Sequence, residues 1–131
     1  MIFDTSVWVD FLRGRQTANA ELLQHHIYND EKVFICPIIY QEILQGVKNE
    51  HELVGLKELL LALDFLSLDG YFAADGGAAV YRQLRAAGLT IRKPNDCAIA
   101  FYAIHFNLKL VHNDSDFDKI AKLTSLETYA T

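Results

Sequence analysis

Met1-Ile2-Phe3-Asp4 opens the chain as a short apolar run that ends in an acid and leads into a first helix. Four further runs of strand length follow at 33–36, 65–68, 109–112 and 126–129. Short apolar runs between turn or cap residues are typical of β-strands. The sequence therefore predicts about five strands.

Segments with helical spacing of apolar residues separate these runs. Two examples are Ile39, Ile43 and Val47 after the second run, and Ile99, Ala103 and Phe106 before the fourth. Strands that are apolar throughout, in alternation with helices, are typical of a parallel sheet covered by helices on both faces. We therefore predict an α/β fold. Because no linker or internal repeat is visible, we expect a single domain over residues 1–131.

The composition excludes several classes of protein. Of 131 residues, 51% are hydrophobic and 22% charged, which fits one domain with a sizeable core. The net charge of −5 argues against the broad basic surface of a general nucleic-acid binder, although local basic patches remain compatible with it. Cys36 and Cys97 support neither a disulfide framework nor a zinc site. Without a signal peptide or a membrane-length apolar run, we expect a cytoplasmic protein with no membrane partner.

Four acids fall where this fold class places its ligands. In an open parallel sheet, ligands bind beyond the carboxyl ends of the strands. Asp4 ends the first run, Asp114 follows the fourth, and Asp96 lies in the first turn of a helix. Glu42 lies about one and a half turns into the helix that follows the second run. We expect these four carboxylates to converge at one edge of the sheet.

Each acid taken alone can be explained as a helix cap or a partner of the helix dipole. Taken together they are less ordinary, because two carboxylates about 5 Å apart repel by roughly 3 kcal/mol at an effective dielectric constant near 20. Protonation of one carboxyl group or a bound hard cation relieves this repulsion, and an all-oxygen ligand set favours Mg²⁺ or Mn²⁺. Carboxylate-bound magnesium most often serves phosphoryl chemistry, so we expect hydrolysis of a phosphodiester.

Four motifs contain these acids. In chain order they are Ile2-Phe3-Asp4-Thr5-Ser6-Val7-Trp8-Val9-Asp10, Gln41-Glu42-Ile43-Leu44-Gln45-Gly46, Asn95-Asp96-Cys97-Ala98-Ile99-Ala100 and His112-Asn113-Asp114-Ser115-Asp116-Phe117. With these motifs, the whole chain resembles the PIN-domain ribonucleases and, among them, the VapC-type toxins of bacterial and archaeal toxin–antitoxin pairs. The order of all four motifs in a chain of this length makes the resemblance specific.

The resemblance implies a three-layer α/β/α PIN fold and an Mg²⁺- or Mn²⁺-dependent endoribonuclease that forms no covalent intermediate. The implied catalytic and metal-binding acids are Asp4, Glu42, Asp96 and Asp114. Asp116 is a fifth candidate metal ligand, because family members vary in the spacing of the last motif. Ser6 is implied as a polar support of the site.

Substrate contacts have to come from cations in spite of the acidic total. Arg92 and Lys93 are the best placed, because they directly precede the helix that carries Asp96, and Arg13 is a further candidate after the first helix. Arg82 and Arg85 can equally be explained as a solvated helix face.

Three further polar residues are interpreted as structural or left open. We set Asp10 and Asp118 aside, and the latter follows a Ser-x-x-Asp pattern typical of a helix start. His112 stands where some relatives of the resembled family have a small hydroxyl residue. It either contacts substrate or merely ends the strand.

The segment 96–106 and the leucine stripe of 53–63 suggest contacts beyond a single sheet face. The first is apolar almost all round, so it must be buried on more than one side, and a dimer interface is one solution. The resemblance implies a homodimer and a VapB-type antitoxin that blocks the acidic site, in a heterotetramer or larger complex. Two alternatives stay open: a PIN nuclease of RNA processing without a toxin role, and a non-catalytic interaction domain whose acids are only caps.

Overall fold

A parallel sheet of very short strands lies at the centre of the molecule. The computed structural model describes residues 1–129. Its strands are β1 (Ile2–Phe3), β2 (Phe34–Ile35), β3 (Asp64–Phe65) and β4 (Leu110–Val111). They are arranged in the order β3-β2-β1-β4, and each neighbouring pair is parallel. The first strand of the chain thus pairs with the last one, in the register Ile2 to Leu110.

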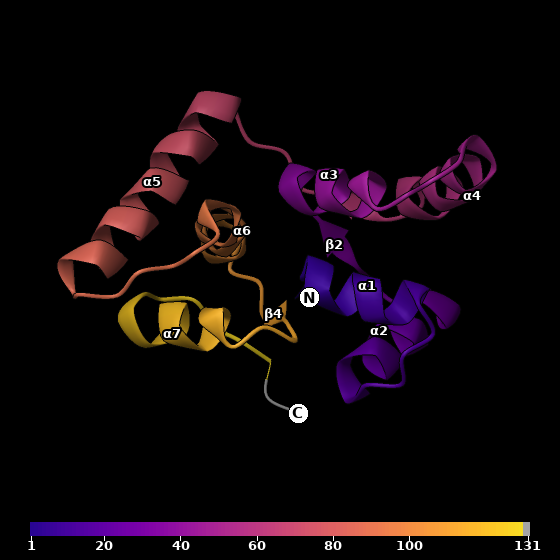
Figure 1. Cartoon of the computed structure of the whole chain (residues 1–131), viewed down its shortest axis with the longest axis horizontal. Coiled ribbons are helices and arrows are strands. Elements are labelled where there is room, and N and C mark those ends of the chain that lie inside the picture. The colour runs from indigo at the N-terminus through magenta and orange to yellow at the C-terminus, as the bar shows by residue number, and fades with distance from the viewer. Residues whose placement is uncertain (130–131) are drawn as a thin grey trace.

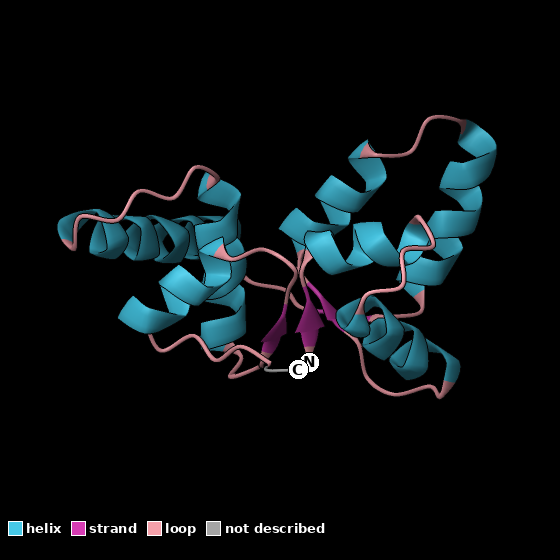
Figure 2. Ribbon diagram, turned by 60° about the horizontal axis from the view of Figure 1, so that its bottom comes forward, coloured by secondary structure: helices cyan, strands magenta, loops and turns pink. Residues whose placement is uncertain are grey.

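Seven helices among the described residues enclose this sheet. They are α1 (Thr5–Leu12), α2 (Ala18–Tyr28), α3 (Pro37–Gln45), α4 (Glu50–Leu61), α5 (Gly70–Ala86), α6 (Pro94–His105) and α7 (Asp116–Leu123). Figures 1 and 2 show the strands between two groups of helices, α1 to α4 on one side and α5 to α7 on the other. No helix of the described residues has the length and apolar composition needed to cross a membrane.

The helices start at residues whose chemistry favours a helix N-terminus. Side chains of Asp4, Thr17, Asn49 and Asp69 accept hydrogen bonds from backbone N–H groups in the first turns of α1, α2, α4 and α5. The helices α3 and α6 instead begin with a proline at the first helical position. Because β1, β2 and β4 end shortly before α1, α3 and α7, the starts of these three helices lie at the carboxyl edge of the sheet.

Helix α6 is buried within the chain itself. Its most extensive helix contact is with α5, and it also packs against α7 and α3. Glycines of α5 permit the close approach: a Cβ atom on Gly77 would lie 3.2 Å from the Cα atom of Ala98, and one on Gly76 would overlap the ring of Phe101. The apolar composition of 96–106 is therefore explained without a dimer interface.

The predicted α/β fold with a parallel sheet is confirmed, with one strand fewer than expected. The third strand lies at 64–65, slightly before the predicted 65–68. The predicted strand at 126–129 forms only a single bridge, between Thr128 and Leu110. Two hydrogen bonds flank this bridge, from Leu110 N–H to Glu127 O (3.0 Å) and from Tyr129 N–H to Leu110 O (2.9 Å). The segment follows β4 as expected but pairs over too short a length to count as a strand.

Candidate active site

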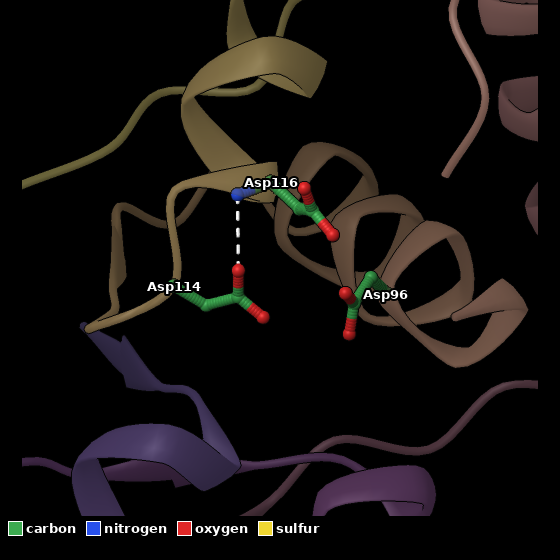
Figure 3. A group of neighbouring side chains, drawn as sticks. All are labelled: Asp96, Asp114 and Asp116. Atoms are coloured by element: carbon green, nitrogen blue, oxygen red, sulfur yellow. Dashed lines mark hydrogen bonds between the residues drawn. The ribbon is translucent and has the colours of Figure 1, made fainter. Parts of the chain in front are cut away.

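Three aspartates form the tightest acidic cluster of the described residues. Asp96 lies in the first turn of α6, Asp114 in the loop after β4, and Asp116 at the start of α7. Each offers a carboxylate oxygen, and these oxygens all lie within 4.8 Å of one another. Figure 3 shows the three side chains pointing toward a common space, with the Asp116 N–H donating to Asp114 Oδ1 at 3.0 Å.

Asp4 also borders this space and is held there by Ser6. It follows β1 directly and is the N-cap of α1. Its Oδ2 accepts from the backbone N–H of Ser6 at 3.0 Å and from the Ser6 hydroxyl at 2.6 Å. The same hydroxyl oxygen accepts from the N–H of Asn113 at 3.0 Å. Ser6 therefore connects the cap of α1 to the loop after β4, which carries Asp114.

Glu42 completes the acidic lining from α3. Its Oε1 accepts a hydrogen bond from the Thr5 hydroxyl at 2.7 Å, so α1 orients this carboxylate as well. Glu42, Asp4, Asp96 and Asp114 all line one cavity of about 340 Å³, which we call the acidic cavity. Asp116 lies beside the cavity and is not among its lining residues.

Burial and mutual repulsion make Asp96 the most perturbed of these acids. Burial and, after it, the negative charges of Asp4, Asp114 and Glu42 raise its pKa to about 7, against the opposing effect of Lys93. Its Oδ2 is buried and has no hydrogen-bond partner. Burial also raises the pKa of Asp4, against the hydrogen bonds from Ser6. A carboxylate oxygen that is buried, unpartnered and surrounded by like charges is poorly stabilised by the protein alone.

Cations neutralise the outer members of the cluster. Lys93 Nζ lies 3.7 Å from Asp114 Oδ2, and Lys119 Nζ lies 3.4 Å from Asp116 Oδ1. Neither ammonium group forms an ion pair with Asp96, although the charge of Lys93 lowers its pKa. The donor set that remains toward the cavity consists of carboxylate oxygens, with no Cys or His side chain lining it, and such a set suits Mg²⁺ or Mn²⁺ rather than Zn²⁺.

Comparison with known proteins identifies the family. The PIN domain model matches residues 1–123. The VapC ribonuclease Mb1587 of Mycobacterium bovis is 34% identical over 128 residues, which cover 97% of this chain and 96% of that protein. The chain belongs to the PIN domain family. Ribonuclease VapC11 of Mycobacterium tuberculosis matches this PIN domain with the same identity and coverage.

Solved structures share the fold of this PIN domain at low sequence identity. VapBC2 from Rickettsia felis, bound to a DNA fragment from its promoter, superposes with a TM-score of 0.74 at 21% identity and covers 98% of both chains. VapBC from Salmonella typhimurium, bound to DNA, gives a TM-score of 0.75 at 18% identity and covers 98% of this chain and 95% of that one. These likenesses confirm the predicted PIN-type α/β fold.

The structure of this PIN domain brings together the four acids that the sequence singled out. Asp4, Glu42, Asp96 and Asp114 line one cavity, with Ser6 beside them, and Asp116 joins the cluster from α7. Of the two candidates in the last motif, Asp114 is the one that lines the cavity.

The candidate substrate-binding cations are separated by the fold. Lys93 lines the acidic cavity, whereas Arg13 lines a neighbouring groove. Arg92 is exposed and lines neither. Arg15 lines the acidic cavity instead of Arg13, because the turn after α1 brings its guanidinium to 3.2 Å from Asp10 Oδ1.

Several polar residues of this PIN domain were missed at the sequence level. Asp10, which we had set aside, lines the cavity and accepts from Asn113 Nδ2 at 2.8 Å. Asn19 of α2 donates to Asn113 Oδ1 and to the backbone oxygen of His112, both at 2.9 Å. Asp10 and Asn113 both stand inside the quoted motifs, which was the available signal. Asn19 had none, because its partners lie more than 90 positions away.

Proposed function

We propose that this PIN domain is an Mg²⁺- or Mn²⁺-dependent endoribonuclease and the toxin of a VapBC-type pair, inhibited by a VapB-type antitoxin. The observation that carries the nuclease proposal is the convergence of Asp4, Glu42, Asp96 and Asp114 on one cavity, with an unpartnered buried oxygen on Asp96. The names of its curated relatives, which are ribonucleases, support the reaction class.

The residues fit a divalent cation. Asp96, Asp114 and Asp116 have the spacing to hold one ion, and Asp4 and Glu42 line the same cavity as Asp96 and Asp114. A hard cation bound there would lower the pKa of a coordinated water and neutralise charge on the phosphate oxygens of RNA. It would also supply the missing partner of Asp96 Oδ2. Without it, the raised pKa of about 7 leaves Asp96 partly protonated near neutral pH, and the carboxyl group must release this proton before it can serve as a ligand.

Other side chains of the chain position these acids and bind the substrate. Ser6 and Thr5 fix the orientations of Asp4 and Glu42 through hydroxyl donors. Lys93, at the rim of the cavity with a side chain that is 66% exposed, is the cation we assign to the phosphate backbone of RNA. Arg92 and Arg13 are assigned more distant backbone contacts.

An apolar groove next to the acidic cavity is the surface that we assign to the antitoxin. The groove has a volume of about 580 Å³ and is lined by Leu12, Ile43, Val47, Leu56 and Leu59. It is continuous with the acidic cavity, because Val9 and Glu42 line both. An antitoxin segment with an apolar face in the groove and a basic side chain directed past Glu42 would block the acids. We further propose a homodimer within a heterotetramer or larger complex, as in toxin–antitoxin assemblies of the VapBC kind.

Cleavage of a mixed RNA pool tests the enzymatic proposal. Purified protein is incubated with Mg²⁺, with Mn²⁺ or with EDTA, and the Asp4→Asn variant is compared with wild type and with Asp75→Asn, a matched charge change at an exposed position of α5. We expect metal-dependent cleavage that Asp4→Asn abolishes and Asp75→Asn retains. Cleavage that survives both EDTA and Asp4→Asn would refute this assignment of the site.

The antitoxin assignment has a separate test. Leu56→Glu places a charge in the groove, whereas Leu61→Glu places the same charge on α4 at a position that is already 63% exposed. We expect only Leu56→Glu to lose binding to a VapB-type antitoxin that binds the wild-type protein, with RNA cleavage retained by both variants. Unchanged binding by Leu56→Glu would move the antitoxin to another surface.

A further inference from the structure

His112 has a defined place in the loop that carries two of the acids. It follows β4 directly, and its side chain is only 9% exposed. The imidazole packs against the ring of Phe117, with the ring centroids 5.4 Å apart. The side chain therefore lies beneath the loop 113–116 and does not project from the strand end into solvent.

Both ring nitrogens have a partner, and together they determine the tautomer. Nδ1 accepts a hydrogen bond from the backbone N–H of Asp114 at 3.2 Å. A ring nitrogen that accepts carries no proton, so the proton of the neutral imidazole is on Nε2. Nε2 lies 3.1 Å from Asp118 Oδ1 and donates to it. Asp118 thus keeps Nδ1 in its accepting form.

The hydrogen-bond chain continues from the imidazole into the acidic cluster. Once its N–H is fixed by His112, Asp114 uses its own Oδ1 to accept from the N–H of Asp116 at 3.0 Å (Figure 3). From the other side, Asn19 Nδ2 holds the backbone oxygen of His112 at 2.9 Å. The imidazole is therefore the group that fixes the Asp114 N–H, within a segment that Ser6 and Asn19 also hold.

We propose that His112 is a positioning residue for the metal-binding acids: by accepting the Asp114 N–H at Nδ1, it holds Asp114 and Asp116 toward Asp96. This inference rests on the proposed metal-dependent function and deepens it. It removes the choice between a substrate contact and a plain strand end, because both ring nitrogens already bond within the loop and its helix.

Three substitutions separate the roles of the ring. His112→Asn retains an acceptor near the position of Nδ1 and shortens the side chain away from Asp118. His112→Gln retains a donor near the position of Nε2 and loses the acceptor. His112→Phe keeps an aromatic ring of similar shape against Phe117 and loses both the donor and the acceptor. His51→Gln, at an exposed position of α4, is the matched control.

The measurement is the affinity for Mn²⁺ alone, titrated by calorimetry in the absence of RNA, together with thermal unfolding of each metal-free variant. We expect His112→Phe and His112→Gln to bind Mn²⁺ about tenfold more weakly than wild type. We expect His112→Asn to restore most of the affinity and His51→Gln to match wild type. Metal-free unfolding curves identify any variant that has lost its fold. The other two substitutions at His112 are then compared with each other and with wild type.

The outcomes separate this inference from the function on which it rests. If wild type binds Mn²⁺ and the folded variants His112→Phe and His112→Gln bind it with the same affinity, the positioning role alone is overturned. Equal weakening by all three substitutions would also overturn it, because the acceptor at Nδ1 would then not be the operative group. No Mn²⁺ binding by wild type would refute the metal-dependent function itself, and the inference with it.

Discussion

Replacing Asp96 by Asn is expected to stabilise the metal-free protein at neutral and alkaline pH. The carboxyl group has a pKa of about 7 in the folded chain against an ordinary value of 3.8. Because the folded state binds this proton more tightly than the unfolded state does, Asp96 favours folding in its protonated form. This contribution is fully present below about pH 4, is lost as the pH rises to about 7, and does not change further above that.

The size of the effect follows from the two pKa values. At about 1.4 kcal/mol per pKa unit, ionisation of Asp96 costs the folded state about 4 kcal/mol. The acidic cavity admits water and salt, which screen the charge, so we expect roughly half of this, about 2 kcal/mol. At about 4 °C per kcal/mol for a chain of this size, Asp96→Asn should unfold about 8 °C higher than wild type at about pH 8.

Thermal unfolding followed by circular dichroism, in EDTA, measures this difference. The advantage of Asp96→Asn should shrink toward zero at about pH 4, while Asp75→Asn, an exposed control on α5, should follow wild type at every pH. In Mg²⁺ at about 100 times its Kd, wild type should gain about 2.7 kcal/mol that the variant lacks, so the order of stability reverses. A variant that is less stable than wild type in EDTA at about pH 8 would refute the reasoning, as would a difference independent of pH.

Three further changes test other parts of the structure. Ser6→Ala removes the hydroxyl between Asp4 Oδ2 and the Asn113 N–H, and should lower the free energy of unfolding in urea by about 1–3 kcal/mol, with exposed Ser125→Ala as the control. Lys93→Ala should weaken binding of a short RNA and reduce the slope of log affinity against log salt concentration by about 1, measured by fluorescence anisotropy in an Asp4→Asn background. Exposed Lys122→Ala should leave this slope unchanged, and an unchanged slope in Lys93→Ala would exclude a phosphate contact. Gly77→Val places a branched side chain against the backbone of α6 at Ala98 and should lower the free energy of unfolding in urea by about 2 kcal/mol. Gly55→Val, with open space around it, should change this free energy by less than about 0.5 kcal/mol, and equal effects of the two variants would contradict the close packing of α5 on α6.

The sequence predicts the order of elements because each strand and each acid carries a local signal. Asp4 and Asp114 stand at the ends of apolar runs, and this alone places them at the carboxyl edge of a parallel sheet. The site also follows from the sequence as far as the four cavity acids are concerned. Local patterns do not fix the exact extent of each strand, and the run at 126–129 forms a bridge rather than a strand because only one residue pair aligns with β4.

The polar residues around the acids could not be predicted in the same way. The conformation of the turn after α1 decides which arginine lines the acidic cavity. It places Arg15 there and places Arg13, two residues earlier, in the neighbouring groove. Asn19 has helical neighbours and no motif, so its bonds to the loop after β4 exist only once α2 packs against that loop. The role of His112 depends on the direction of an imidazole, which a strand-end position leaves undetermined.

The place of β1 in the middle of the sheet has a consequence during translation. The strand emerges first from the ribosome, but one of its two neighbours, β4, is among the last segments to be made. In a nascent chain, one edge of β1 therefore stays unpaired until residues 110–111 have been synthesised. The acidic cluster cannot form before Asp114 and Asp116 have been added. Pairing between the two ends of a chain also slows folding. An unfinished polypeptide thus has no assembled acidic cluster, so the proposed cleavage of RNA would begin only after nearly the whole chain has been made.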